Sequence, residues 1–183
     1  MKRNVSKFLY FFIGLLGFKA NAALATDIFV CDPDNALQGE ATDDRHKGCI
    51  DVLSWSWGSV LELGGQVGGA RDGTSEVADF SFTKYVDKSS PILMESSTSG
   101  KTFPKVEIHN YKSCCDPEYV KITLEDVLVS SYQTGGSAGE PLPTENVSLN
   151  FTKIEYCYTY IDEFGKPGIP DCYGWDVSTK SSY

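Results

Sequence analysis

Six cysteines are the residues with the clearest capacity for chemistry in this 183-residue chain. They are Cys31, Cys49, Cys114, Cys115, Cys157 and Cys172. An even number of cysteines is typical of a disulfide framework in an exported protein and is rare in a cytosolic one. Six cysteines allow about fifteen pairings, so the spacing alone does not choose among them.

The sequence around four of these cysteines favours two pairings. Cys31 ends a predicted first strand and Cys49 opens the next, with a turn-rich connection between them. Cys157 and Cys172 flank a Gly/Pro-rich turn in the same manner. We therefore predict the disulfides Cys31–Cys49 and Cys157–Cys172, each joining the two arms of a hairpin-like unit. The two adjacent cysteines are predicted either to pair with one another or to join another chain.

The two histidines, His46 and His109, do not complete a catalytic or metal-binding pattern. A Ser-His-Asp arrangement needs a histidine that is held by a carboxylate and faces a nucleophile. His46 lies in the charged turn 43–47 and His109 lies beside solvent-facing positions of a predicted strand, so both are predicted to be surface residues. His46 and Cys49 could form half of a zinc site, but the chain has no C-x-x-C and disulfides would consume the thiolates. We expect no catalytic residue and no metal.

Other motifs are equally incomplete. The segment 64–71 has two glycines at the separation of a phosphate-binding loop but ends in Ala-Arg, and 95–102 ends in Gly-Lys-Thr but begins with glutamate. The carboxylates form no pattern that marks glycoside hydrolysis. The glycosylation sequons at Asn146 and Asn150 lie in a predicted strand and are interpreted as structural. We therefore expect no cofactor.

The N-terminus has the parts of a secretory signal peptide in their usual order. Three basic residues stand among the first seven, an uncharged apolar run follows at 8–18, and Ala20-Asn21-Ala22 places small residues where signal peptidase reads them. The apolar run is too short to cross a bilayer, which takes about 20 residues. These features predict removal of the segment and not anchoring by it.

We predict cleavage after Ala22, with a second suitable site at 23–25. Residues 1–22 are then a signal peptide, and 23–183 is a single domain, periplasmic or secreted. Cleavage removes four basic residues and leaves 12 against 25 acidic ones, so the net charge moves from −9 to −13. A chain this acidic is repelled by nucleic acid and by anionic membranes, so neither is expected as a partner.

Alternating apolar residues predict a mainly β fold. The alternation runs through 50–57, 80–83, 106–109, 120–124 and 147–160. It changes phase near 152–153 and again between 124 and 127, and we predict β-bulges there. Bulges in long strands are typical of a strongly curved sheet or barrel.

One helix and one long connection complete the prediction. Ser89 or Ser90 can cap the helix, Pro91 suits its first turn and Gly100 can end it. The glycine-rich stretch 58–74 is either a long loop or an extended hairpin.

Six segments in one order resemble the Hcp family, the tube proteins of bacterial type VI secretion. They are DVLSWSWG at 51–58, DFSFTKYVDKSSP at 79–91, SGK at 99–101, TGGS at 134–137, ENVSLNF at 145–151 and YGW at 173–175. The match extends from about residue 27 to about residue 177. Each segment is short, but their common order makes the resemblance specific.

The resemblance implies a compact β-barrel of two packed sheets with one short helix, in which 58–74 protrudes toward a neighbouring subunit or ring. It implies a non-catalytic, ring-forming structural or carrier protein that assembles as a homohexamer, takes small effectors as cargo and contacts other type VI components. Members of the family ordinarily lack a signal peptide and six cysteines, so this chain is expected to be an exported variant. The alternative is a secreted monomeric β-barrel module that binds carbohydrate or protein.

Overall fold

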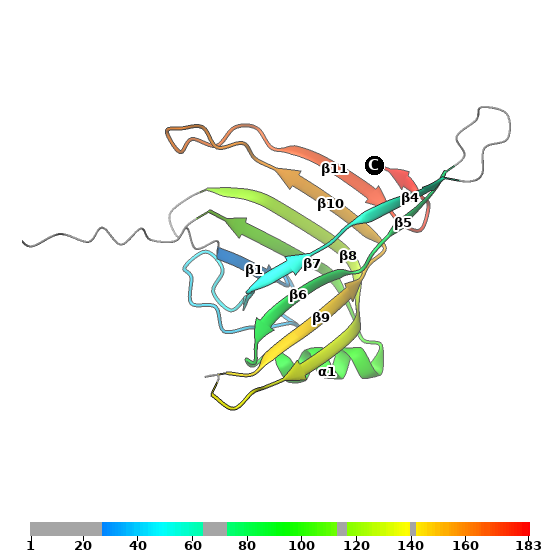
Figure 1. The fold of residues 1–183 in the computed structure, drawn as a ribbon. Helices are drawn as coiled ribbons and strands as arrows, with labels where there is room; N and C mark the ends of the chain where they lie inside the picture. Colours follow the sequence, from blue (N-terminus) through cyan, green and yellow to red (C-terminus); the bar gives the residue numbers. More distant parts are fainter. Residues whose placement is uncertain (1–26, 64–72, 113–116, 140–141) are drawn as a thin grey trace, which may run out of the picture.

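The computed structural model describes residues 27–63, 73–112, 117–139 and 142–183. Within these ranges the chain forms twelve strands and one helix, α1 (Ser90–Ser99), shown in Figure 1. The strands are β1 (Asp27–Cys31), β2 (Ile50–Asp51), β3 (Ser54–Ser56), β4 (Ser59–Leu63), β5 (Gly73–Val77), β6 (Phe80–Tyr85), β7 (Thr102–Tyr111), β8 (Glu118–Gly135), β9 (Thr144–Asn150), β10 (Lys153–Tyr158), β11 (Asp171–Asp176) and β12 (Ser181–Ser182). The prediction of a mainly β fold is confirmed. The described residues do not include the predicted signal peptide, Cys114 or Cys115.

Strand β8 belongs to two sheets and joins them. Its first half lies between β7 and β10, and its second half pairs with β9. One sheet has the order β12-β11-β10-β8-β7-β1-β2, and the other has the order β8-β9-β6-β3. The sheets curl around one core (Figure 1), which confirms the two packed sheets, but their hydrogen bonds do not close the barrel completely.

The bend that carries β8 from one sheet to the other lies at Asp126, whose φ is 51°. Leu124 and Val127 are both fully buried, so the inward face changes phase across this residue. Val106 and Phe103 of β7 are their cross-strand partners and are also fully buried. The register between β7 and β8 is the same on both sides of the bend, so the two strands bend together and neither gains a residue.

The prediction of a β-bulge near 152–153 is wrong, because this place is the junction between two strands. Strand β9 ends and β10 begins there, and the residues on either side of this junction pair with β8 in the same register. The intervening Thr152 N–H donates a 3.0 Å hydrogen bond to the carbonyl oxygen of Glu125. A register shift occurs instead between Val129 and Ser131, where β8 has already entered the second sheet.

The predicted strand at 50–57 is divided into β2 and β3. The Val52 N–H donates to the Ile28 carbonyl of β1, and the next N–H, of Leu53, donates to the Thr83 carbonyl of β6. The chain therefore changes sheets between these two residues. Leu53 is 47% exposed, so it does not share a buried face with Trp55 as the alternation suggested.

The core consists of the inward-facing residues of both sheets. Its fully or almost fully buried members include Val30, Ile50, Phe80, Phe82, Leu93, Phe103, Val106, Ile108, Ile122, Leu124, Val127, Val129, Val147, Leu149 and Ile154. Most of them come from strands in which every second residue is apolar, so each strand buries one complete face. Burial of these side chains is the main force that holds the two sheets together.

Helix α1 has the boundaries that the sequence predicts. Pro91 lies in its first turn, where a missing N–H costs nothing, and Gly100 ends it with a φ of 73°. The Gly100 N–H donates to the Ser96 carbonyl, and Leu93 is fully buried against the core. The helix lies on the second half of β8 (Figure 1).

A buried ion pair fixes the helix start to the second sheet. The Lys84 ammonium lies 2.8 Å from Glu145 and 2.8 Å from Asp87, and both Lys84 and Glu145 are fully buried. The Ser90 hydroxyl donates to the same Glu145 oxygen at 2.9 Å, while the Tyr132 hydroxyl donates to the other oxygen. The carboxylate is thus satisfied on both oxygens, which is the condition for burying a charge without a large penalty.

Candidate functional site

Two disulfides tie neighbouring strands in the pattern that the sequence predicts. Cys31, at the end of β1, is bonded to Cys49, which immediately precedes β2, with a Cα–Cα distance of 4.7 Å. Cys157 and Cys172 are directly opposed on β10 and β11, with a Cα–Cα distance of 4.1 Å. Each bond closes a connection between antiparallel strands and limits the separation of its two ends.

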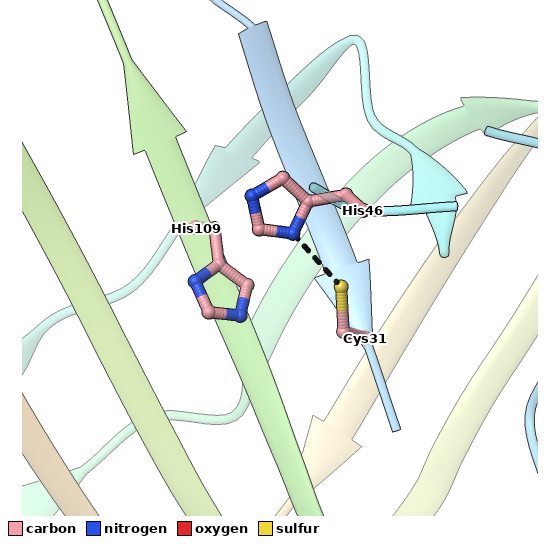
Figure 2. A group of neighbouring side chains, drawn as sticks. All are labelled: Cys31, His46 and His109. Carbon is pink, nitrogen blue, oxygen red and sulfur yellow. Dashed lines mark hydrogen bonds between the residues drawn. The ribbon is translucent and has the colours of Figure 1, made fainter. Parts of the chain in front are cut away.

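The prediction that both histidines are surface residues is wrong. His46 is 8% exposed, and the side chain of His109 is 12% exposed. Their ring centroids lie 4.6 Å apart, and Figure 2 shows the two rings beside the Cys31 sulfur. His46 comes from the loop between Cys31 and Cys49, which folds back over the outer face of β1 and β7. The sequence gives no sign of this contact because the two histidines are 63 positions apart.

Each imidazole of this cluster is held by a second group. His46 places Nδ1 3.6 Å from the Cys31 sulfur and Nε2 2.7 Å from the Tyr111 hydroxyl. His109 places Nδ1 2.6 Å from a carboxylate oxygen of Glu118. Its Nε2 lies 3.6 Å from Glu107, too far for a hydrogen bond. We call Cys31, His46 and His109 the sulfur–histidine cluster.

Burial sets the protonation of the groups around this cluster. Burial, with the neighbouring His109 ring, lowers the pKa of His46 below its ordinary value, so the ring is neutral at neutral pH. Burial, with the Glu118 carboxylate, raises the pKa of Tyr111 to about 12. The contact between His46 and Tyr111 is therefore a hydrogen bond between two neutral groups.

The sulfur–histidine cluster does not form a hydrolytic triad in this state. Glu118 orients His109 as a triad carboxylate would, but the histidine faces a second imidazole and a sulfur that is bonded to Cys49. A nucleophilic cysteine must carry a free thiolate, which the disulfide removes.

A second feature is the hairpin of β4 and β5, which projects from the two sheets (Figure 1). Its two strands pair antiparallel, so of the two alternatives predicted for 58–74 the extended hairpin is correct and the long loop is not. Residues 64–72, between the two strands, lie outside the described residues. One face carries Leu61 and Leu63, which are 60% and 61% exposed, beside Ser75. The other face carries Glu62 and Glu76 together with Val60. The hairpin therefore has one uncharged, largely apolar face among its described residues.

An aromatic cavity of about 390 Å³ lies at the base of this apolar face. It is lined by Trp57, Ser59, Ser75, Val77, Ile154, Tyr156, Tyr173 and Trp175. The buried indole N–H of Trp57 has no hydrogen-bond partner among the described residues. Buried indole groups usually have such a partner, so Trp57 is an exception among the described residues.

The outer face of the second sheet is polar and largely uncharged, with the Asp79 carboxylate at its margin, where it accepts hydrogen bonds from Ser130 and Asn150. Cross-strand partners share a face, so the register places hydroxyl and amide side chains side by side over β3, β6, β9 and the end of β8. They are Ser54, Ser56, Ser81, Thr83, Ser131, Gln133, Thr144, Asn146 and Ser148. The Ser81 hydroxyl lies 2.9 Å from that of Ser148, and Thr83 donates to Asn146 at 2.8 Å. We call this the neutral polar face.

No helix among the described residues is long and apolar enough to span a membrane.

Comparison with known proteins agrees with this architecture. The family model described as type VI secretion system effector, Hcp, matches residues 29–158. The protein named hcp1 from Pseudomonas aeruginosa (strain PAO1) is 44% identical over 158 residues, which cover 84% of this chain and 96% of the relative. The crystal structure of Hcp1 from Salmonella typhimurium has a TM-score of 0.71 at 28% identity and covers 87% of this chain and 99% of its own. A structure described as a type six secretion system protein has a TM-score of 0.76 at 27% identity, covering 87% and 100%. This chain belongs to the Hcp family of type VI secretion proteins.

Proposed function

We propose that the mature chain is a non-catalytic structural subunit that assembles with copies of itself into a closed ring of six. Membership of the Hcp family supports a structural role in type VI secretion. The observation that carries self-association is the apolar hairpin face, which exposes Leu61 and Leu63 beside an aromatic cavity. Exposed apolar surface of this kind, bounded by charged residues, is typical of protein–protein contact sites.

The contact that we propose is heterologous. The hairpin of one subunit projects away from its own sheets and packs on the next subunit, and the same contact repeated around an axis closes a ring. The hairpin's apolar face and the aromatic cavity at its base form one continuous part of this contact. A stable contact of this type buries more than about 1,000 Å².

The neutral polar face is proposed to line the interior of the ring. Each mature subunit carries 12 basic and 25 acidic residues, so six subunits repel one another most strongly where they converge. An uncharged interior reduces this repulsion. Hydroxyl and amide side chains also contact small effector proteins without selecting for the charge of the cargo, which suits a carrier.

We further propose that residues 1–22 are a signal peptide, that 23–183 form one domain and that the protein is exported to an oxidising compartment. The support is the N-terminal sequence together with two disulfide-bonded cysteine pairs. Export to an oxidising space would permit these bonds to form.

The test of assembly is light scattering on the oxidised mature protein at micromolar concentration. The expected mass is six times that of the monomer. A monomer under these conditions would contradict the ring and favour a secreted binding module instead.

A further inference from the structure

The sulfur–histidine cluster has the composition of a metal site in which one ligand is blocked. Its three potential donor atoms, one each from Cys31, His46 and His109, all lie within 4.8 Å of one another. A tetrahedral zinc ion with bonds of about 2.0–2.3 Å needs donors about 3.3–3.8 Å apart. Closing the observed separations therefore requires small movements. The obstacle is chemical, because the Cys31 sulfur is bonded to Cys49.

We propose that reduction of the Cys31–Cys49 disulfide converts this cluster into a tetrahedral site for a thiolate-binding divalent metal such as zinc. Cys31, His46 and His109 are three of the ligands, and the Cys49 thiolate, freed by the same reaction, is the fourth. The resulting Cys₂His₂ set is one of the common structural zinc sites.

The groups around the cluster hold the imidazoles as outer-shell partners hold metal ligands. A metal-binding histidine usually donates a hydrogen bond from its other ring nitrogen to a carboxylate or another polar group, and this bond fixes the orientation of the ring. His109 Nδ1 is hydrogen-bonded to the Glu118 carboxylate at 2.6 Å, so the other ring nitrogen, Nε2, can coordinate a metal. His46 Nε2 is hydrogen-bonded to the Tyr111 hydroxyl at 2.7 Å. Its other ring nitrogen, Nδ1, faces the Cys31 sulfur (Figure 2).

The ligands also stand on supported elements. Cys31 and His109 lie on the same face of the paired strands β1 and β7, where Cys31 opposes Glu107 and Phe29 opposes His109. The loop that carries His46 begins at Asp32, whose carboxylate accepts three backbone N–H bonds from the residues that follow. A metal at this place would join the loop to the sheet, as the disulfide does.

The conversion is a balanced thiol–disulfide exchange with a dithiol reductant. One thiolate of the reductant attacks the sulfur of Cys49, the less buried of the two residues, and Cys31 leaves as a thiolate beside His46. The second thiol of the reductant then displaces Cys49, and the reductant departs as a disulfide with two electrons transferred to the protein. Binding of a divalent metal to the two cysteines releases two protons.

The metal-bound state suits the reducing cytosol in which the chain is made, and the disulfide-bonded state suits the oxidising compartment to which we propose it is exported. In a reducing compartment the metal holds 31–49 in place, and in an oxidising compartment the disulfide does so. The second disulfide offers a contrast, because Cys157 and Cys172 have no histidine beside them among the described residues.

The test is a cobalt titration of the full mature chain after reduction with a phosphine in the absence of oxygen. Reduced protein is expected to bind one Co²⁺ per chain with thiolate-to-cobalt absorption, and Zn²⁺ is expected to displace it. Oxidised protein is expected to show no such absorption. A reduced chain without thiolate-to-cobalt absorption would overturn the proposal.

Cys49→Ser and Cys31→Ser form the decisive matched pair, since both lose the same disulfide. Cys49→Ser keeps the three grouped donors Cys31, His46 and His109 and is expected to bind Co²⁺ without any reductant. Cys31→Ser removes the thiol beside His46 and is expected to bind Co²⁺ more weakly, through Cys49 and the two histidines. Equal cobalt binding by the two variants would overturn the proposal. Loss of cobalt binding by the reduced double variant Cys157→Ser/Cys172→Ser, which keeps all four proposed ligands, would also overturn it. Glu118→Gln is expected to weaken zinc binding about 10–100-fold, because it removes the group that orients His109.

Discussion

Lys84 and Glu145 lie directly opposite one another on β6 and β9, and their side chains form a 2.8 Å ion pair in the interior of the protein. A second Lys–Glu pair with the same cross-strand relation, Lys153 with Glu125, spans 3.5 Å on the surface. The two pairs share their chemistry and differ in burial. They therefore allow the effect of burial on an ion pair to be measured within one molecule.

Lys84→Met is expected to reduce the free energy of unfolding by about 3–5 kcal/mol, because it leaves the Glu145 charge buried without its partner. Lys153→Met is expected to change it by about 1 kcal/mol or less, because water screens the exposed pair. Urea denaturation of the oxidised protein measures both. Similar losses in the two variants would show that burial does not determine the strength of the Lys84 pair.

Replacing Cys157 and Cys172 together by serine is expected to reduce the free energy of unfolding by about 3 kcal/mol, the entropy of closing a loop of this size in the unfolded chain. The bond closes a separation of 15 residues, and Cys31–Cys49 closes one of 18, so each pair should contribute a similar amount. Non-reducing peptide mapping of the wild type checks the pairing first. A peptide that joins Cys31 to Cys157 would contradict it.

Leu61→Lys is expected to break the proposed ring into smaller species, because it places a charge on the apolar face of the hairpin. Val60→Lys is the matched control, since Val60 is 63% exposed and Leu61 60%, but Val60 lies on the opposite face beside Glu76. Light scattering on the two variants and the wild type gives the masses. A ring that survives Leu61→Lys, or one that dissociates equally in both variants, would exclude the apolar face as the contact.

Protein isolated from the periplasm or medium is expected to begin at Ala23, as measured by intact mass. Deleting residues 1–22 is expected to leave the chain in the cytosol even where a type VI machine is active, because the chain then lacks its export signal. Secretion of the truncated chain at the wild-type level would show that the type VI machine carries it. A mass that includes Met1 would contradict cleavage.

Tyr132 is expected to ionise late in an alkaline titration. Burial, together with its hydrogen bond to Glu145, raises the pKa of Tyr132 to about 12, against an ordinary value of about 10. Since the folded-state pKa is the higher one, the stabilisation is complete below pH 10 and is lost as the pH rises toward 12. Phenolate absorbance follows all tyrosines together, ten in the full chain and nine once residues 1–22 with Tyr10 are removed, and Tyr132→Phe should remove one late-titrating group. An unchanged late phase in this variant would assign the shift to another tyrosine.

Local sequence determined the type and many boundaries of the elements. The alternation of Phe80 and Phe82 with polar residues identified a half-buried strand, since the side-chain period of a strand does not depend on its partners. Pro91 and Gly100 marked the two ends of the helix because each has a backbone conformation suited to that position. The turn-rich connection between Cys31 and Cys49 favoured their pairing, which the structure shows as a disulfide.

Tertiary structure alone decided which polar groups are buried. The sequence places His46 in a charged turn, yet the loop folds over β1 and β7 and brings it to His109. Lys84 continues the alternation of β6, but its burial depends on Glu145, which is 61 positions away. The alternation of apolar and polar residues along a strand indicates which side chains share a face, but it does not indicate which other part of the chain covers that face. Partners distant in sequence supply the hydrogen bonds and charges that make burial of a polar group favourable, and only the fold brings them together.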